Sequence, residues 1–293
     1  MKIRGILFTV ISAFIYGFTP VLASMTYKMG NNALSMTFYR NFFAIPILFI
    51  LLRYNKIDLR VKKSDLKNIA AVSLFGVAAT TVLLYSSYSY IGVGSATTLH
   101  FMYPVFVALI CKFAFREKLG KKKVITLIFA CIGVLFFIDL KHITNLFGVL
   151  MAVASSFTYA FYMVWMEKKQ LVRQDPYKLS LYIAALVAAI LFIGNMFWGY
   201  LIVDMPLKAF VLIIIVALCA SFLAAILIQM GIKEIGSSSA AIFCLFEPIT
   251  SVIIGALVLN EKVNMLEMIG CIIIFFAITY LAVMNRTTGD CNN

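Results

Sequence analysis

A carboxyl group lies in the middle of a long apolar stretch in the last quarter of the sequence. Glu247 is the eleventh residue of the stretch 237–259, so it would lie roughly 15 Å deep if this stretch crossed a bilayer as a helix. A charge at that depth costs at least about 2.5–3.5 kcal/mol. The residue type and its depth predict a coupling or cation-binding group, and the alternative is a buried acid that only bridges helices.

An arginine lies inside a second apolar stretch, at residues 34–53. Arg40 is about six residues from the end of this stretch, which is too deep for a loop residue. Its planar guanidinium could clamp a substrate carboxylate or pair with Glu247. The alternatives are a structural ion pair and a long side chain that extends outward to the membrane surface.

A histidine and a set of tyrosines could complete a site. His100 titrates near neutral pH in its ordinary state and would suit a proton relay, although a lone histidine in a helix often only bonds a carbonyl. Tyrosine rings can line a cavity and stack on cations, although most aromatic residues of this chain must pack against helices or lipid. The candidates for the cavity wall are Tyr16, Tyr159, Tyr85, Tyr88 and Tyr103, with the first two favoured.

Three prolines interrupt apolar stretches. Pro104 and Pro248 each follow a polar candidate, and a proline inside a helix leaves one carbonyl without its N–H partner. His100 is one turn before Pro104, so the two would share a helix face. Pro20, with Gly17 nearby, predicts a kink in the first apolar stretch.

The elements that must position these residues are membrane helices. Of the 293 residues, 63% are apolar and only 13% are charged, against about 25% charged in soluble domains. The net charge of +13 comes from basic residues in short loops, which favours orientation in a bilayer over binding of nucleic acid. Ten stretches are long enough to span: 4–26, 34–53, 67–90, 95–115, 122–139, 146–166, 177–199, 207–230, 237–259 and 264–284.

The distribution of basic residues predicts the orientation. With the N-terminus inside the cell, 20 of the 25 lysine and arginine residues lie on the inner side and four on the outer side, with Arg40 within a span. Inner loops of membrane proteins are enriched in these residues. We therefore expect a multi-pass protein of the inner or plasma membrane with both termini in the cytoplasm.

The sequence repeats itself faintly. Residues 91–138 match 235–282 at an offset of 144, and the first apolar stretch matches the sixth at an offset of 143. Five spans per half is an odd number, so the second half must enter the membrane upside down. Matching pairs include Ile91-Gly92 with Ile235-Gly236, Pro104 with Pro248, Glu117-Lys118 with Glu261-Lys262, and Gly5 and Tyr16 with Gly148 and Tyr159.

The fourth and ninth stretches are similar to a known pattern. They read IGVGSATTLHFMYPVFVALICKFAFREKL and IGSSSAAIFCLFEPITSVIIGALVLNEKV. The chain resembles the drug/metabolite transporter superfamily, specifically its EamA-type carriers, over two units at 5–138 and 147–283. One departure is Tyr16-Gly17, where many members carry Trp-Gly. The resemblance implies an inner-membrane secondary carrier that often exports amino acids or other small metabolites.

These observations predict an all-α integral membrane protein of ten transmembrane helices, arranged as two inverted five-helix repeats. We expect a secondary transporter that moves a small polar metabolite, an amino acid or a related compound, outward by alternating access, with protons as a candidate coupling ion. A transporter of organic cations or drugs and a channel are the alternatives. The six cysteines have neither disulfide nor zinc spacing, and motifs for hydrolysis or ATP binding are missing. We therefore expect no enzyme activity, metal or cofactor, and the oligomeric state stays open.

Overall fold

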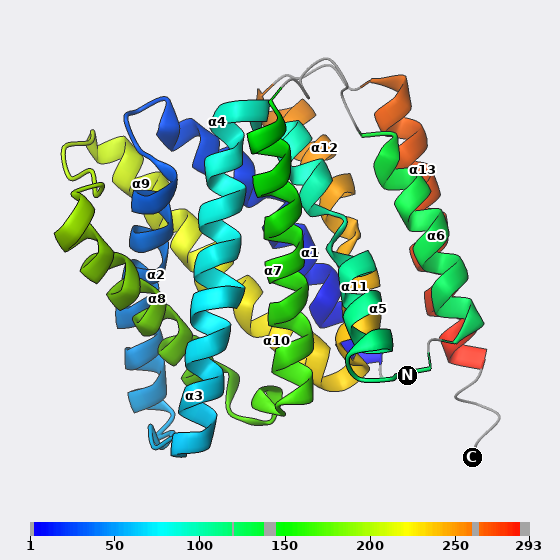
Figure 1. Ribbon diagram of the computed structural model, residues 1–293, viewed down its shortest axis with the longest axis horizontal. Coiled ribbons are helices and arrows are strands. Elements are labelled where there is room, and N and C mark those ends of the chain that lie inside the picture. Colours follow the sequence, from blue (N-terminus) through cyan, green and yellow to red (C-terminus); the bar gives the residue numbers. More distant parts are fainter. Residues whose placement is uncertain (1–2, 119, 138–144, 260–263, 288–293) are drawn as a thin grey trace.

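The structure, a computed structural model, describes residues 3–118, 120–137, 145–259 and 264–287, and every regular element in these ranges is a helix (Figure 1). The elements are α1 (Ile3–Tyr27), α2 (Ala33–Tyr54), α3 (Lys63–Ala71), η1 (Val72–Ala78), α4 (Ala79–His100), α5 (Tyr103–Phe113), α6 (Lys121–Leu135), α7 (Leu146–Lys168), η2 (Leu171–Arg173), α8 (Pro176–Trp198), α9 (Leu207–Val216), η3 (Ala217–Ala224), α10 (Ala225–Ile235), α11 (Ser237–Cys244), α12 (Phe246–Leu259) and α13 (Met265–Thr287).

Eight helices within the described residues are long and apolar enough to cross a membrane. The predicted boundary between 67–90 and 95–115 contains Gly92, whose backbone is not helical, so the run Lys63–His100 of α3, η1 and α4 consists of two helices joined by a kink at Gly92. The chain then continues in the shorter apolar helix α5. The last residues of the predicted stretch 122–139 lie outside the described residues. The all-helical membrane fold is therefore confirmed, while ten separate spans stay a prediction.

The backbone repeats features at the spacing that the sequence repeat predicts. Gly92 has φ 75° and ψ 165°, and its counterpart Gly236 has φ 78° and ψ 157°, a conformation that is open almost only to glycine. Both halves also contain a π-helical segment before this glycine, η1 in the first half and η3 in the second. The two halves therefore share a backbone pattern despite their sparse sequence identity.

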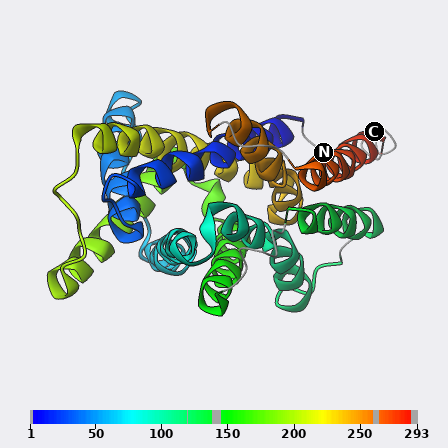
Figure 2. The ribbon, with the colours of Figure 1, turned by 90° about the horizontal axis from the view of Figure 1, so that it is seen from above.

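The first helix of each half packs against the other half. α1 contacts α10, α11 and α12, and α7 contacts α4 and α5. A Cβ atom on Gly5 would lie 2.6 Å from Cβ of Glu234, and one on its repeat partner Gly148 would lie 2.6 Å from Cβ of Tyr90. α1 begins at the lower end of the bundle in Figure 1, whereas α7 begins at the upper end. Seen from above, α4, α5, α6 and α7 lie along one side of the bundle (Figure 2).

The prolines lie where a helix begins rather than inside one. α4 ends at His100 and α5 begins at Tyr103, so Pro104 is in the first turn of α5. Pro248 is likewise in the first turn of α12. The first N–H groups of a helix have no helical partner, so a proline fits there without the loss of a helical hydrogen bond. The prediction that His100 and Pro104 share one helix face is wrong, because the helix breaks between them.

Pro20 does not break its helix. α1 continues through Pro20 to Tyr27. The carbonyl of Tyr16, one turn earlier, lacks the N–H that proline cannot supply, and the hydroxyl of Thr19 donates to it at 2.9 Å. A neighbouring hydroxyl therefore satisfies the backbone group that Pro20 leaves free.

Candidate functional site

A cavity of about 120 Å³ lies between the two halves, and residues of α1, α2, η1, α4, α7, α8, η3, α10 and α12 line it. About 10–15 Å³ of such space holds one water molecule, so the cavity has room for about ten groups of that size. Of the residues predicted from the sequence, those on the wall are Tyr16, Pro20, Arg40, Tyr85, His100, Tyr159 and Glu247. Tyr103, Pro104 and Pro248 do not line it.

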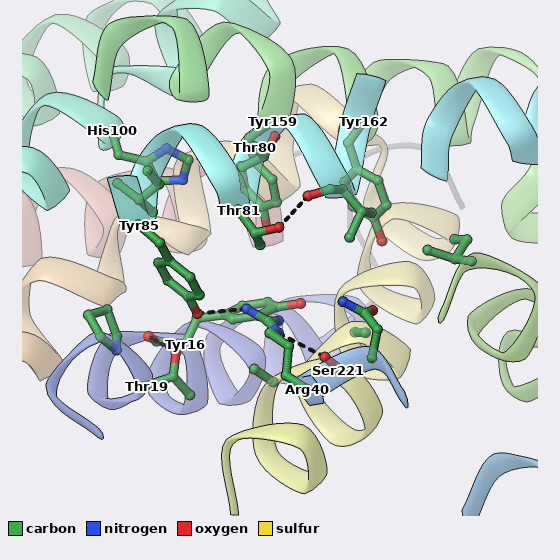
Figure 3. Close-up of a pocket in the computed structure, with 18 of the residues that line it drawn as sticks. Tyr16, Thr19, Arg40, Thr80, Thr81, Tyr85, His100, Tyr159, Tyr162 and Ser221 are labelled. Atoms are coloured by element: carbon green, nitrogen blue, oxygen red, sulfur yellow. Dashed lines mark hydrogen bonds between the residues drawn. The ribbon is translucent and has the colours of Figure 1, made fainter. Parts of the chain in front are cut away.

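Arg40 is fixed in place by hydroxyl groups (Figure 3). Its side chain is 7% exposed, Nε donates to Oγ of Ser221 at 2.9 Å, and Nη1 donates to Oη of Tyr85 at 2.7 Å. Within the part of the chain that the structure describes, no ion pair joins Arg40 to Glu247. The buried position contradicts the interpretation as a side chain that extends to the membrane surface. Because these hydrogen bonds use Nε and Nη1, Nη2 remains for a ligand.

Glu247 lies in the first turn of α12, where the helix dipole favours a negative charge. The residue as a whole is 5% exposed. Its Oε1 atom is fully buried and has no hydrogen-bond partner. α1 approaches closely at this point, since a Cβ on Gly17 would lie 2.7 Å from the carbonyl oxygen of Glu247. Ser251 on α12 donates to the carbonyl of Gly17 at 2.6 Å. The two helices thus hold an unsatisfied carboxyl oxygen at the cavity.

His100 lies at the end of α4 and is also buried. Its Nδ1 is 2.9 Å from Oγ of Ser155 on α7, so its partner is a side-chain hydroxyl and not a carbonyl. The imidazole ring is 5.4 Å from the ring of Tyr159 and 5.5 Å from that of Tyr103. The histidine therefore connects the cavity wall to the helix break before α5.

Three tyrosine rings beside the cavity contact one another in a row. The ring of Tyr103 meets that of Tyr159 edge-on at 4.8 Å, and Tyr159 stacks on Tyr162 at 5.7 Å. The hydroxyls of Tyr103 and Tyr159 are buried without a hydrogen-bond partner. Tyr103 thus supports the wall from behind the cavity, while Tyr16 faces the cavity near Arg40 (Figure 3).

Several wall residues had no prediction from the sequence. They are polar groups on helices: Thr19, Asn41, Thr80, Thr81, Tyr162, Ser180, Ser221 and Gln229. Gln229 is 2% exposed, its Nε2 donates to Oγ of Ser180 at 3.0 Å, and its Oε1 is buried without a partner. Asn41 and Gln229 carry a usable signal, because amide side chains are costly inside apolar stretches. Serine and threonine carry none, because their hydroxyls can bond their own helix.

The arrangement suits a ligand with groups of both charges. A guanidinium with a free donor and a carboxyl group with a free acceptor face the same small cavity, among hydroxyls and aromatic rings. Among the described residues, no group of three or more histidine, cysteine or acidic side chains could hold a metal ion.

A bundle of membrane-spanning helices with repeated backbone features and a central cavity between its halves is typical of membrane transporters. The chain belongs to the EamA-like transporter family, which matches residues 3–138 and 146–283, within the drug/metabolite transporter superfamily. It is a multi-pass membrane protein.

Similar proteins carry the same general description. The uncharacterized transporter YcbK of Bacillus subtilis is 26% identical over 97% of this chain and 95% of its own length. An uncharacterized transporter of Synechocystis is 27% identical over 68% of this chain and 62% of its own length. A solved structure, described only as a crystal structure of a protein, has a TM-score of 0.80 at 12% identity and covers 98% of this chain and 99% of that chain. This last likeness concerns the fold alone.

Proposed function

We propose that the protein is a secondary carrier that exports a small polar metabolite, an amino acid or a related compound, by alternating access. The observation that carries the proposal is that Arg40 and Glu247 line one small cavity without pairing with each other. Arg40 binds the carboxylate of the substrate, and Glu247 binds its ammonium group or exchanges a proton. Tyr16 and Tyr159 form the walls between which the substrate lies.

The size of the cavity supports an amino acid over a drug. Room for about ten water-sized groups corresponds to a molecule of about ten non-hydrogen atoms, whereas drug-sized ligands occupy pockets of about 300–1,000 Å³. A channel would use rings of like charges or a filter of carbonyls, and the wall instead has one guanidinium and one carboxyl group. An organic cation remains the second candidate, because the free oxygen of Glu247 and the tyrosine rings suit a positive charge.

The proton is the coupling ion that this site favours. A carboxyl group buried at the cavity can hold a proton and release it when the cavity opens to water. His100 is the second candidate for this role. We place the carrier in the inner or plasma membrane with both termini in the cytoplasm, on the basis of the 20-to-4 distribution of basic residues.

Reconstitution tests this function. Purified protein is first screened by thermal shift against amino acids, amines and nucleosides, since a ligand at 100 times its Kd stabilises by about 2.7 kcal/mol. The best ligand is then followed into liposomes, where we expect saturable uptake that a pH gradient drives above equilibrium. Uptake that never saturates would indicate a channel, and a chemically altered product would indicate an enzyme.

A further inference from the structure

A group of charged side chains joins three helix ends at the lower end of the bundle in Figure 1. Lys168 is the last residue of α7, and it forms an ion pair with Glu117, which follows α5. The Nζ atom of Lys168 also lies 3.7 Å from Oε1 of Glu167. Glu167 accepts hydrogen bonds from the backbone N–H of Ser237 at 2.8 Å and from its hydroxyl. The end of α7 thereby connects α5 of the first half with α11 of the second.

A third contact closes the group. Sγ of Cys111 on α5 is 3.8 Å from Oγ of Ser237 on α11, and α5 and α11 pack against each other. Each of these two helices belongs to the broken span of its half, next to the central cavity. Contacts from α7 therefore tie these two helices together at the lower end of the bundle.

Space near this group leads toward the central cavity. Glu167 and Lys168 line a cleft of about 490 Å³. This cleft shares Lys233 with a second cleft of about 140 Å³, and the second cleft shares Gln229 with the central cavity. The two clefts therefore follow one another from this group of charges to Gln229, which also lines the central cavity.

Two members of this group have uncharged repeat partners, and Glu261, the repeat partner of Glu117, lies outside the described residues. At the offset of 143, the counterparts of Glu167 and Lys168 are Ser24 and Met25, which carry no charge. Two inverted halves of identical sequence would give inward-open and outward-open states of equal free energy. Because the repeat partner of Lys168 is Met25, the pair between Lys168 and Glu117 has no copy between the repeat-related residues, and an ion pair that forms in one state only makes the two states unequal in free energy.

We propose that Glu117, Glu167 and Lys168 form a latch that holds the lower end closed, so that the carrier at rest favours the state in which the cavity is shut on this side. By the distribution of basic residues this side is the cytoplasm. Each transport cycle breaks the ion pair between Lys168 and Glu117 when the lower end opens. The latch rests on the proposed function, because only a carrier that alternates needs it.

A cysteine in the cavity reports which side is open. Ala184 lines the cavity and is 2% exposed, so a cysteine at this position can be labelled only from within the cavity. The Ala184→Cys substitution is made in a chain whose native cysteines have been replaced, with serine in place of Cys111. A small membrane-impermeant thiol reagent is applied to inside-out and to right-side-out vesicles without substrate. We expect Lys168→Met and Glu117→Gln to raise the labelling rate from the cytoplasmic side about two- to five-fold, as the loss of a partly exposed ion pair would produce.

Two variants control this measurement. Lys168→Arg keeps the charge and should leave the labelling rate at the wild-type value. Lys169→Met removes the neighbouring lysine, whose Nζ lies 4.7 Å from the ring of Trp165 and which makes no ion pair among the described residues. It should also leave the rate unchanged.

The outcomes separate the latch from the carrier. Labelling of the wild type from both sides, with no change in Lys168→Met or Glu117→Gln, would overturn the latch and keep alternating access. An equal rise in Lys169→Met would also overturn it. Labelling from one side only in every variant would contradict alternating access itself.

Discussion

At the scale of single residues, Glu247 leads to a direct prediction. Glu247→Gln keeps the shape of the side chain but cannot ionise, so the protein should fold, reach the membrane and lose proton-driven accumulation. Exchange of substrate across the membrane should be retained in part, because the cavity keeps its shape. The measurement is uptake into proteoliposomes with and without an imposed pH gradient.

A matched variant isolates the effect of position. Glu267→Gln makes the same chemical change in the first turn of α13, where the carboxylate accepts from the N–H of Asn264. We expect this variant to accumulate substrate as the wild type does. Unchanged accumulation in Glu247→Gln would rule out Glu247 as the coupling site and leave His100 as the next candidate.

Arg40 leads to a prediction about affinity. Arg40→Gln should raise the Kd of a carboxylate substrate about ten- to hundred-fold, because a charge-assisted hydrogen bond is lost in a cavity shielded from water. The Kd of the matching carboxamide, which carries no negative charge, should change much less. Binding isotherms for both ligands to both proteins measure the difference, and an equal loss for both ligands would make Arg40 a structural residue.

The candidate site was predictable where a residue is costly to bury. Arg40 and Glu247 stand out in the sequence because a charge in an apolar stretch needs a reason. Ser221, which holds the guanidinium, gave no such signal, because serine is common in helices and its partner is 181 positions away along the chain. Polar contacts between distant helices depend on how the helices pack, which the pattern of one stretch does not contain.

At the scale of the elements, the repeat-related glycines are the critical positions. Gly92→Ala and Gly236→Ala should each destabilise the protein by about 1–3 kcal/mol, because their backbone conformation is strained for any residue with a Cβ. Nothing lies within 4 Å of a Cβ built on Gly92, so at that position the penalty comes from the backbone alone. Thermal unfolding in detergent measures the loss.

Gly94 offers the comparison within the same helix. A Cβ on Gly94 also meets nothing within 4 Å, and its φ is not positive, so Gly94→Ala should unfold at or above the wild-type temperature. Pro104→Ala and Pro248→Ala should also unfold at nearly the wild-type temperature, because each proline lies where a helix begins. Equal melting temperatures for Gly92→Ala and Gly94→Ala would contradict the role given to Gly92.

The sequence indicated both the helices and the regions where they are interrupted, but not the form of each interruption. Long apolar stretches indicate helices directly, and the fixed offset between Gly92 and Gly236 indicates that one backbone feature occurs twice. The break between His100 and Tyr103 precedes the proline that the sequence marked as the interruption. A proline is compatible with the start of a helix as well as with a kink, so its position alone does not distinguish the two.

At the scale of the whole molecule, the orientation in the membrane is open to test. Lys121, at the start of α6, and Lys208, at the start of α9, lie toward opposite ends of the bundle. In a cysteine-free chain, Lys121→Cys should react with an impermeant thiol reagent only from the cytoplasm, and Lys208→Cys only from outside. Reaction of both cysteines from one side would contradict the inverted arrangement. Lys262, the repeat partner of Lys118, is also expected on the outer side, but it lies outside the described residues.

The π-helical segments η1 and η3 bear on how this chain tolerates the loss of a residue. In each segment the closing N–H reaches back five residues, from Ala79 to Leu74 and from Ala225 to Ala220, so each holds one residue more than a regular helical turn needs. A deletion in an ordinary membrane helix turns every residue beyond it by about 100°. A deletion within η1 or η3 would instead convert the wide turn to a regular one and leave the flanking faces in register. We therefore expect this chain to tolerate the loss of one residue at these two places, both on the wall of the cavity, better than elsewhere in its membrane helices.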